Sequence, residues 1–260
     1  MEKAQKLNIT ILQSSITWED AEANRKQFEA KINTIKNKTD LIILPEMFTT
    51  GFTMNAAKFA ETMSGETISW MQKIALKKQT AITGSLIIED NNNFYNRLVF
   101  VNPVGKIDFY DKRHSFTLAK EDETYVSGTK KLIIEYKGWK ICPLICYDLR
   151  FPVWSRNTEH YDLLLYIASW PKKRIYAWDN LLKARAIENI SYTIGVNRIG
   201  KDANNFDHNG HSIALNYLGM PLSEENKESE TIIQVSLDKQ KQDTTRKKLG
   251  FLKDKDFFYF

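Results

Sequence analysis

Apolar residues along the chain follow two spacings: an alternation or short run typical of β-strands, and a recurrence every three to four residues typical of helices. Short apolar runs that end at polar or turn residues predict the strands. We place them at residues 6–13, 40–46, 80–88, 94–102, 106–111, 132–136, 139–145, 162–168, 191–198 and about 211–217 and 230–237.

Three segments have helical spacing. The segment 17–20 resembles a capping box that opens the first helix, and the other helices are expected at 66–78 and 174–190. The apolar face of the first helix consists of Ala21, Phe28, Ile32 and Ile35. In the turn between the first two of these, only Asn24 and Arg25 fall on this face, so we expect the first half of this helix to be less buried.

Turn residues join some strands directly. Lys137-Gly138 fits a two-residue hairpin turn, and residues 90–93 form an Asn-rich turn. Strands that alternate with helices, with hairpins mixed in, indicate a layered α/β fold with mixed sheets. We find no repeat, low-complexity segment or linker. We therefore expect one domain over residues 1–260, with a C-terminal arm at about 238–260.

Composition places the chain among ordinary globular proteins, with 42% hydrophobic, 27% charged and 12% aromatic residues. The N-terminal apolar run is short and lacks a cleavage site, and no stretch approaches the roughly 18 apolar residues of a membrane span. Two cysteines four positions apart do not make a disulfide framework. We expect a cytoplasmic protein with reduced thiols and no membrane partner.

The formal net charge of +5 comes mostly from residues 238–256, which hold seven Lys or Arg against four Asp. We interpret them as one solvated segment, and because no nucleic-acid module accompanies them we expect no nucleic-acid partner. Two alternatives stay open: a basic segment that recruits an anionic partner, or an arm that packs over a dimer contact. The apolar residues available to such an arm are Phe251, Phe257, Phe258, Tyr259 and Phe260.

Both cysteines lie in the stretch ICPLICYDLRFP, and only Cys146 reaches the end of its strand. Glu46, Lys112 and Cys146 each stand at a strand end, where α/β proteins build their sites. A carboxylate that takes the thiol proton would make Cys146 a nucleophile. The Lys112 ammonium and the Tyr147 backbone N–H could then stabilise the oxyanion formed from an amide. The trio points to amide cleavage, with Cys142 as a core residue.

Ordinary roles compete with this interpretation, because a lone Lys or Glu after a strand is usually a solvated residue. The histidines are His114, His160, His208 and His211. His208 and His211 lack a third ligand nearby, so we expect loop histidines, one of them near the site, and no metal. No P-loop, GxGxxG or papain-like signature appears, which argues against phosphate, dinucleotide and papain-type sites. We expect no cofactor.

Three local motifs favour the catalytic interpretation. LPEMFTTGF around Glu46, YDKRHSF around Lys112 and CYDLRFPVWSRN around Cys146 resemble, in that order, the catalytic motifs of the nitrilase or carbon–nitrogen hydrolase superfamily, over essentially the full length. The last motif and the later ARAIEN are similar to those of bacterial omega-amidases. The resemblance implies a four-layer α-β-β-α sandwich with two mixed β-sheets, usually paired into a homodimer. It also implies that Glu46 is the general base, Lys112 the oxyanion stabiliser and Cys146 the nucleophile.

The resemblance further implies a supporting glutamate between the Lys and Cys motifs. Residues 120–123 hold three acids. Members of the superfamily keep this glutamate seven residues before a glycine, so Gly128 selects Glu121 over Glu123.

The resemblance to omega-amidases implies small dicarboxylic acid monoamides, 2-oxoglutaramate and 2-oxosuccinamate, cleaved to acid and ammonia through a cysteine thioester. The carboxylate remote from the amide calls for a cation, and Arg150 is the candidate, unless it only holds the Cys loop. Phe52, Phe116 and Trp170 lie just beyond motif or strand ends and are expected as pocket walls, with core packing as their alternative.

Competing functions share parts of this description. An amidase for another small amide, such as deaminated glutathione, or an N-carbamoyl hydrolase would use the same triad. A non-catalytic binding protein on the same fold is a further alternative. The intact Glu46, Lys112 and Cys146 argue against it.

Overall fold

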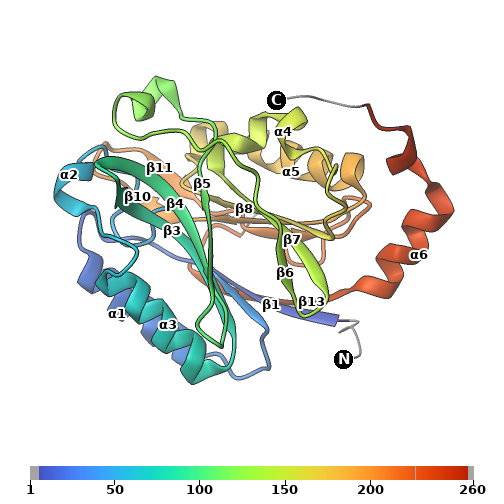
Figure 1. Cartoon of the computed structure of the whole chain (residues 1–260), viewed down its shortest axis with the longest axis horizontal. Coiled ribbons are helices and arrows are strands. Elements are labelled where there is room, and N and C mark those ends of the chain that lie inside the picture. Colours follow the sequence, from blue (N-terminus) through green and yellow to red (C-terminus); the bar gives the residue numbers. More distant parts are fainter. Residues whose placement is uncertain (1–5, 226, 257–260) are drawn as a thin grey trace.

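Two β-sheets face each other at the centre of the molecule (Figure 1). The computed structural model describes residues 6–225 and 227–256. The six-stranded sheet has the order β13-β1-β2-β3-β4-β5, the five-stranded sheet has the order β12-β9-β8-β7-β6, and β10 pairs with β11. The strands are β1 (Lys6–Gln13), β2 (Leu41–Ile43), β3 (Ala81–Asp90), β4 (Asn93–Val101), β5 (Ile107–Asp111), β6 (Ile134–Tyr136), β7 (Trp139–Ile145), β8 (Leu163–Ala168), β9 (Tyr192–Asn197), β10 (Ile199–Lys201), β11 (Asp207–Asn209), β12 (Ile213–Leu215) and β13 (Thr231–Asp238).

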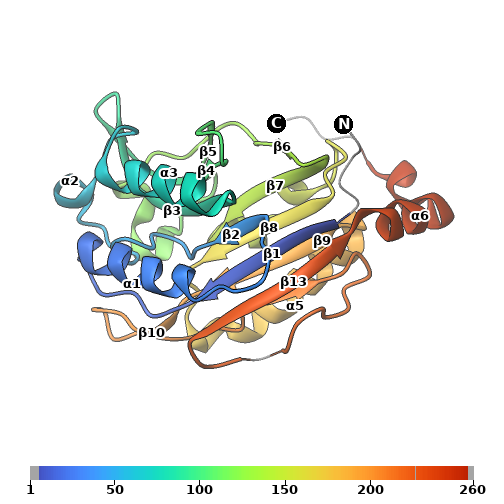
Figure 2. The same ribbon diagram turned by 90° about the horizontal axis from the view of Figure 1, so that it is seen from below.

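Helices cover the outer faces of both sheets. Figure 2 shows α1 and α3 on the side of the six-stranded sheet and α5 on the opposite side, below the five-stranded sheet. The helices are α1 (Ala21–Asn33), α2 (Ala56–Phe59), α3 (Glu66–Lys78), α4 (Pro152–Ser155), α5 (Ile175–Asn189) and α6 (Lys239–Leu249). Short 3₁₀ turns are η1 (Thr117–Ala119), η2 (Glu121–Glu123), η3 (Cys146–Arg150), η4 (Lys172–Arg174) and η5 (Phe251–Asp254).

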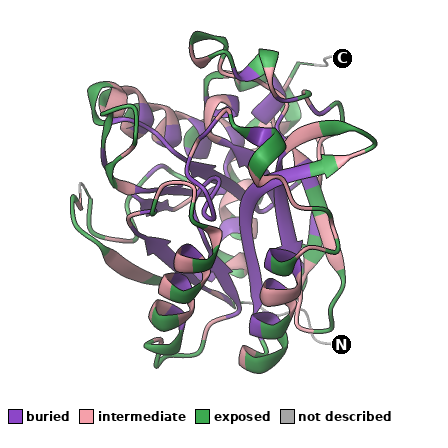
Figure 3. Ribbon diagram, turned by 90° about the vertical axis from the view of Figure 1, so that its left-hand side faces the viewer, coloured by how far each residue is buried: buried purple, intermediate pink, exposed green. Residues whose placement is uncertain are grey.

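The side chains of β2 show how the layers form. Leu41 and Ile43 belong to the core between the sheets, whereas Ile42 packs in the second core with Phe28 of α1 and Met71 of α3. This follows from the period of two along a strand. Figure 3 shows the result, buried strands inside and helices whose outer faces are exposed. The expected four-layer α-β-β-α sandwich is confirmed.

Both sheets are mixed, as expected. In the six-stranded sheet β1, β2 and β3 run parallel, and β3, β4 and β5 run antiparallel. In the five-stranded sheet β7, β8 and β9 run parallel, while β6 pairs with β7 antiparallel. Parallel strands place their carboxyl ends at one edge of a sheet, which is where side chains from separate segments can meet.

The two turns expected from the sequence are both two-residue hairpin turns. Tyr136 pairs with Trp139, and Lys137 and Gly138 between them have φ of 49° and 78°. Asp90 pairs with Asn93 across residues 91–92, whose φ values are also positive. Positive φ at both central residues is the type I′ arrangement, whose twist matches that of the paired strands.

The first helix begins later than the segment 17–20 suggests. The helix starts at Ala21, and the Asp20 carboxylate accepts the backbone N–H of Ala23 at 2.9 Å, so a single cap replaces the expected capping box. The expectation of a less buried first half is wrong at Asn24, which is fully buried. Its amide group donates to the carbonyls of Thr17 and Thr49, both at 2.7 Å. Hydrogen bonds therefore anchor the turn that lacks apolar residues.

The C-terminal segment 238–256 packs on the body of the molecule through α6. Arg246 donates to the Asp162 carboxylate at 3.1 Å, and the Lys239 ammonium lies 2.6 Å from the same group. The expectation of a purely solvated segment is therefore wrong, because two of its cations neutralise a buried carboxylate. Phe251 is exposed, and residues 257–260 lie outside the described part of the chain.

A helix that spans a membrane needs about 20 consecutive, mostly apolar residues. Within residues 6–225 and 227–256, every helix falls short of that requirement.

Candidate active site

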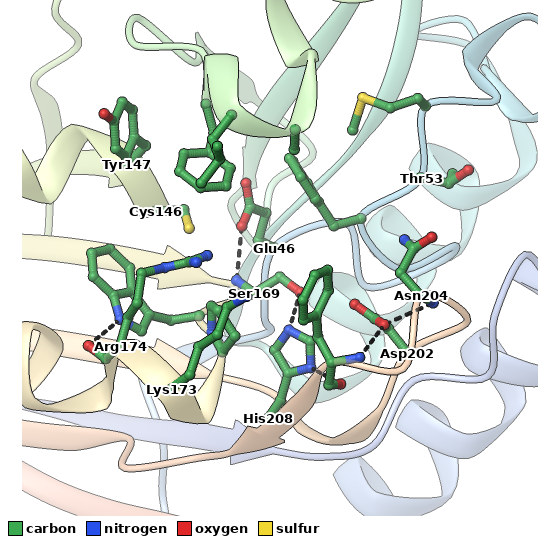
Figure 4. Close-up of a pocket in the computed structure, with 18 of the residues that line it drawn as sticks. Glu46, Thr53, Cys146, Tyr147, Ser169, Lys173, Arg174, Asp202, Asn204 and His208 are labelled. Atoms are coloured by element: carbon green, nitrogen blue, oxygen red, sulfur yellow. Dashed lines mark hydrogen bonds between the residues drawn. The ribbon is translucent and has the colours of Figure 1, made fainter.

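Residues that follow three different strands line one pocket of about 830 Å³. Glu46 follows β2, Lys112 follows β5, and Cys146 follows β7. All three line the pocket, which Figure 4 shows with Cys146, Glu46 and Ser169 at its centre. The sequence placed these side chains at strand ends, and the structure brings them together.

A buried ion cluster lies at the base of the pocket. The Lys112 ammonium donates to Glu46 Oε1 at 3.0 Å and to both carboxylate oxygens of Glu121 at 2.9 Å. Glu121 Oε2 also accepts the backbone N–H of Phe116 at 2.6 Å. All three charged side chains are almost completely removed from solvent. The choice of Glu121 over Glu123 agrees with this geometry, because Glu123 is exposed.

The electrostatics of the cluster follow from two carboxylates that share one ammonium. Burial alone lowers the pKa of Lys112, but the carboxylates of Glu121 and Glu46 outweigh it and raise that pKa above its ordinary value, so Lys112 stays charged. Burial raises the pKa of Glu121, and the neighbouring Glu46 adds to the rise against the opposing effect of Lys112. The cluster therefore has a high affinity for an additional proton.

Cys146 is held at a sharp bend between β7 and η3. Its φ is 45°, a backbone conformation that costs a residue with a side chain about 1 kcal/mol or more. The Ser169 backbone N–H, which follows β8, donates to Glu46 Oε2 at 2.7 Å and also interacts with the Cys146 sulfur. Burial and the Glu46 carboxylate raise the pKa of the Cys146 thiol well above its ordinary value. The resting thiol is neutral and lies beside a carboxylate that can accept its proton.

Asp148 fixes the Cys loop against the Lys loop. Its Oδ2 accepts the backbone N–H of Ile145 at 3.0 Å and the Tyr110 hydroxyl at 2.8 Å. Its Oδ1 accepts the backbone N–H of His114 at 3.0 Å and contacts the His114 ring at 2.7 Å. The sequence interpretation missed this residue. A carboxylate two positions after a candidate nucleophile was the available signal.

Asn96 was also missed. It lies on β4, and its Nδ2 donates to Glu46 Oε1 at 2.8 Å, in the middle of the buried cluster. A polar residue inside the apolar run 94–102 was the only sequence sign of it. The amide adds a neutral donor that orients the carboxylate without adding charge.

Another arginine holds the Cys loop, which is the alternative role considered for Arg150. Arg185 of α5 is buried and donates to the Leu149 carbonyl at 2.7 Å. Arg150 itself is exposed, lines the pocket and stacks with its guanidinium 5.0 Å from the Trp170 ring.

The family model described as carbon-nitrogen hydrolase matches residues 8–247. The chain belongs to the carbon–nitrogen hydrolase family. It is 45% identical over 213 residues to omega-amidase YafV of Yersinia enterocolitica, covering 82% of each chain, and 32% identical to a 2-oxoglutaramate amidase of Bacillus subtilis, covering 96% of this chain and 97% of that one. The crystal structure of XC1258 from Xanthomonas campestris, a CN-hydrolase superfamily protein, is similar with a TM-score of 0.95 and 38% identity, covering 98% of this chain and 99% of that one.

The three aromatic residues expected as walls all line the pocket of this carbon–nitrogen hydrolase. The Phe52 ring lies 5.1 Å from the Lys112 ammonium, and the Phe116 ring contacts Tyr147 edge to face with centroids 5.1 Å apart. Trp170 is buried and its indole N–H donates to the Arg174 carbonyl at 2.9 Å. Tyr147 is the second residue of η3, directly after Cys146, and its backbone N–H stays our candidate oxyanion donor.

The opposite wall of the pocket comes from the β10–β11 ribbon. His208 lies in β11 and is buried, so the expectation of a loop histidine is wrong for this residue, although it is the one that lines the pocket. Its Nε2 lies 3.4 Å from the Ser169 hydroxyl, and its Nδ1 lies 3.1 Å from the Phe206 carbonyl. Burial, reinforced by the Arg198 guanidinium, lowers the pKa of His208 to about 4, so the ring is neutral.

His211 has a structural role outside the pocket. Its Nδ1 contacts the Asp179 carboxylate at 3.0 Å, which ties residue 211 to α5. In the described part of the chain no group of three or more His, Cys, Asp or Glu side chains could hold a metal ion.

Proposed function

We propose that this carbon–nitrogen hydrolase cleaves the terminal carboxamide of small dicarboxylic acid monoamides, 2-oxoglutaramate and 2-oxosuccinamate, to the acid and ammonia. The observation that carries the proposal is the buried cluster of Glu46, Lys112 and Glu121 next to the Cys146 thiol in one pocket. The similarity to an omega-amidase and a 2-oxoglutaramate amidase supports this class of substrate.

In the proposed first half of the reaction, Glu46 takes the Cys146 proton while the sulfur attacks the carboxamide carbon. The C–S bond forms, and the carbonyl electron pair moves to oxygen. The Lys112 ammonium and the Tyr147 N–H would stabilise this oxyanion in a site shielded from water. When the intermediate collapses, the C–N bond breaks, the leaving group takes the proton from Glu46 and departs as ammonia, and a thioester remains.

In the second half, Glu46 takes a proton from water as the water oxygen attacks the thioester carbon. The second tetrahedral intermediate collapses, the C–S bond breaks, and the sulfur regains its proton from Glu46. The sum is amide plus water to acid plus ammonia. Glu121 would act by holding Lys112, because both of its oxygens contact that ammonium.

Ammonia release from 2-oxoglutaramate by the purified protein tests the proposal, with glutamine, asparagine and an N-carbamoyl amino acid as comparison substrates. We expect strong release from 2-oxoglutaramate and none from a Cys146→Ala variant. Carbon dioxide released with ammonia from the N-carbamoyl substrate would instead identify a carbamoylase. Silence on every amide, with Cys146 inert to alkylation, would overturn the enzyme assignment in favour of a binding protein.

We also propose that the chain forms one domain and assembles as a homodimer in the cytoplasm. Exposed apolar side chains on the face of α4 and α5, Val153, Tyr176 and Ile187, support a protein contact there. Sedimentation velocity should give twice the chain mass of 30.3 kDa, and a species of the single-chain mass at micromolar concentration would contradict the dimer. Cell fractionation tests the location.

A further inference from the structure

Arg174 is one of the cations that line the pocket. It ends η4 and stands directly before α5, and its guanidinium lies 4.9 Å from the Phe116 ring. Burial lowers its pKa, Arg150 lowers it further, and the negative charge that Cys146 can carry opposes this. Arg174 therefore lies within electrostatic reach of both the sulfur and a second guanidinium.

Within the part of the chain that the structure describes, Arg150 and Arg174 have no carboxylate to neutralise them. Among the ion pairs of the described residues, neither side chain takes part, and the neighbouring Lys173 takes part in none either. In contrast, the buried Arg97 pairs with Asp111 at 2.6 Å, and Arg246 pairs with Asp162. A cluster of like charges without a counter-ion is unfavourable unless an anion binds to it.

The acidic residue of the β10–β11 wall does not compensate these cations. Asp202 lines the pocket, and its carboxylate accepts the backbone N–H groups of Asn204 and Phe206, both at 2.9 Å. Figure 4 shows Asp202 and Asn204 on one side of Ser169, and Arg174 and Lys173 on the other side, below Cys146 and Tyr147. The η4 wall of the pocket is thus cationic, and the β10–β11 wall beside it is not.

Aromatic rings hold the two guanidiniums in place. Arg174 lies over Phe116, and Arg150 lies 5.0 Å from the ring of Trp170. Cation–π contacts of this kind restrict a planar guanidinium before a ligand arrives, which reduces the entropy lost on binding. A planar guanidinium also matches a carboxylate with two parallel hydrogen bonds.

We infer that Arg174, assisted by Arg150, forms the subsite for the carboxylate at the end of the substrate remote from the carboxamide. This inference rests on the proposed function and moves the main contact from Arg150, the candidate from the sequence, to the more buried Arg174. With this subsite, efficient binding requires the anionic end of the substrate, and neutral amides of the same length are disfavoured.

Paired substrates test the subsite. Succinamate carries the remote carboxylate, and butyramide has a methyl group in its place. The variants are Arg174→Gln, Arg174→Lys and Arg150→Gln. The matched control is Lys172→Gln, an adjacent cation that pairs with Glu228 at 3.2 Å and does not line the pocket.

Arg174→Gln should reduce kcat/KM for succinamate by roughly 10- to 100-fold, mainly through KM, since hydrogen bonds to charged groups have about this weight. The ratio of kcat/KM for succinamate to kcat/KM for butyramide should therefore fall, and circular dichroism checks that the variant is folded. Arg174→Lys should keep part of the kcat/KM for succinamate that Arg174→Gln loses. Arg150→Gln should lose less of it, because Arg150 is more exposed. An equal loss on both amides, or no loss on succinamate, would overturn the subsite.

Binding of succinate, the product dicarboxylate, separates this inference from the proposed function. Calorimetry with wild-type protein and Arg174→Gln needs no turnover. Succinate binding that is lost in Arg174→Gln, in a protein that hydrolyses no amide, would support the subsite and reject the amidase. Amide hydrolysis by the wild type with unchanged succinate binding in Arg174→Gln would reject the subsite and leave the amidase standing.

Discussion

The carboxylate of Glu46 accepts the backbone N–H of Ser169 at 2.7 Å, although the two residues are 123 positions apart. Glu46 follows β2 of the six-stranded sheet, and Ser169 follows β8 of the five-stranded sheet. The same N–H interacts with the Cys146 sulfur. One backbone amide therefore links the candidate base, the candidate nucleophile and the relative position of the two sheets.

The two cysteines should respond differently to substitution. Cys146→Ala should abolish ammonia release and leave stability almost unchanged, because the residue is only partly buried. Cys142→Ala should keep the activity and lower the free energy of unfolding by about 1 kcal/mol, because it leaves a small cavity in the core. Urea unfolding and an ammonia assay on both variants check this. Loss of activity in folded Cys142→Ala would contradict it.

Glu121→Gln should reduce kcat by roughly 100-fold with little change in KM, the scale seen when one oxyanion stabiliser is disturbed. The neutral amide would no longer hold the Lys112 ammonium with two charged oxygens, and the pKa of Lys112 would fall. The matched control is Glu123→Gln in the same 3₁₀ turn, whose side chain is exposed. Equal activities of the two variants would show that Glu121 has no part in turnover.

Glu46→Gln should change thiol reactivity and turnover in opposite directions. Burial comes first and the Glu46 charge second among the causes that raise the pKa of the Cys146 thiol. Removal of that charge lowers this pKa, so more thiolate is present at pH 8, and iodoacetamide should alkylate the variant faster while ammonia release is lost. Mass spectrometry of the alkylated site, with Glu46→Gln/Cys146→Ala as the unreactive control, gives the rates. Slower alkylation would mean that Glu46 activates the thiol even toward this reagent.

His208 should make stability depend on pH. Its pKa is lowered from 6.5 to about 4 by burial and then by Arg198, with Asp202 opposing. The unfolded chain therefore takes up a proton at a higher pH than the folded chain, so stability is fully present above pH 6.5 and is lost as the pH falls toward 4. Over that window the loss from this group is about 3 kcal/mol.

The measurement is the urea unfolding free energy at pH 7.5 and at pH 4.5 for wild type and His208→Gln. The variant should lose less stability than the wild type between these two values, because glutamine does not titrate. Identical losses would mean that His208 is accessible to protons in the folded state.

Local sequence patterns determined most of the secondary structure of this protein and the places of its candidate catalytic residues. Strands, hairpin turns and the positions of Glu46, Lys112 and Cys146 at strand ends depend on the period of neighbouring side chains and on turn residues, which are properties of short segments. Glu121 came from a motif spacing, and its contacts with Lys112 agree with that choice. The four-layer arrangement came from the family resemblance.

Tertiary structure alone decided which buried polar groups form hydrogen bonds with one another. Asn96 and Asp148 contact partners on other elements, and no pattern along the chain reveals which buried donors they face. The sequence likewise offered Arg150 and could not separate it from Arg185 or Arg174, because an arginine becomes a structural clamp or a free cation only through its surroundings. Periodicity is a local property of the chain, whereas charge compensation and desolvation depend on the three-dimensional packing of residues from both sheets.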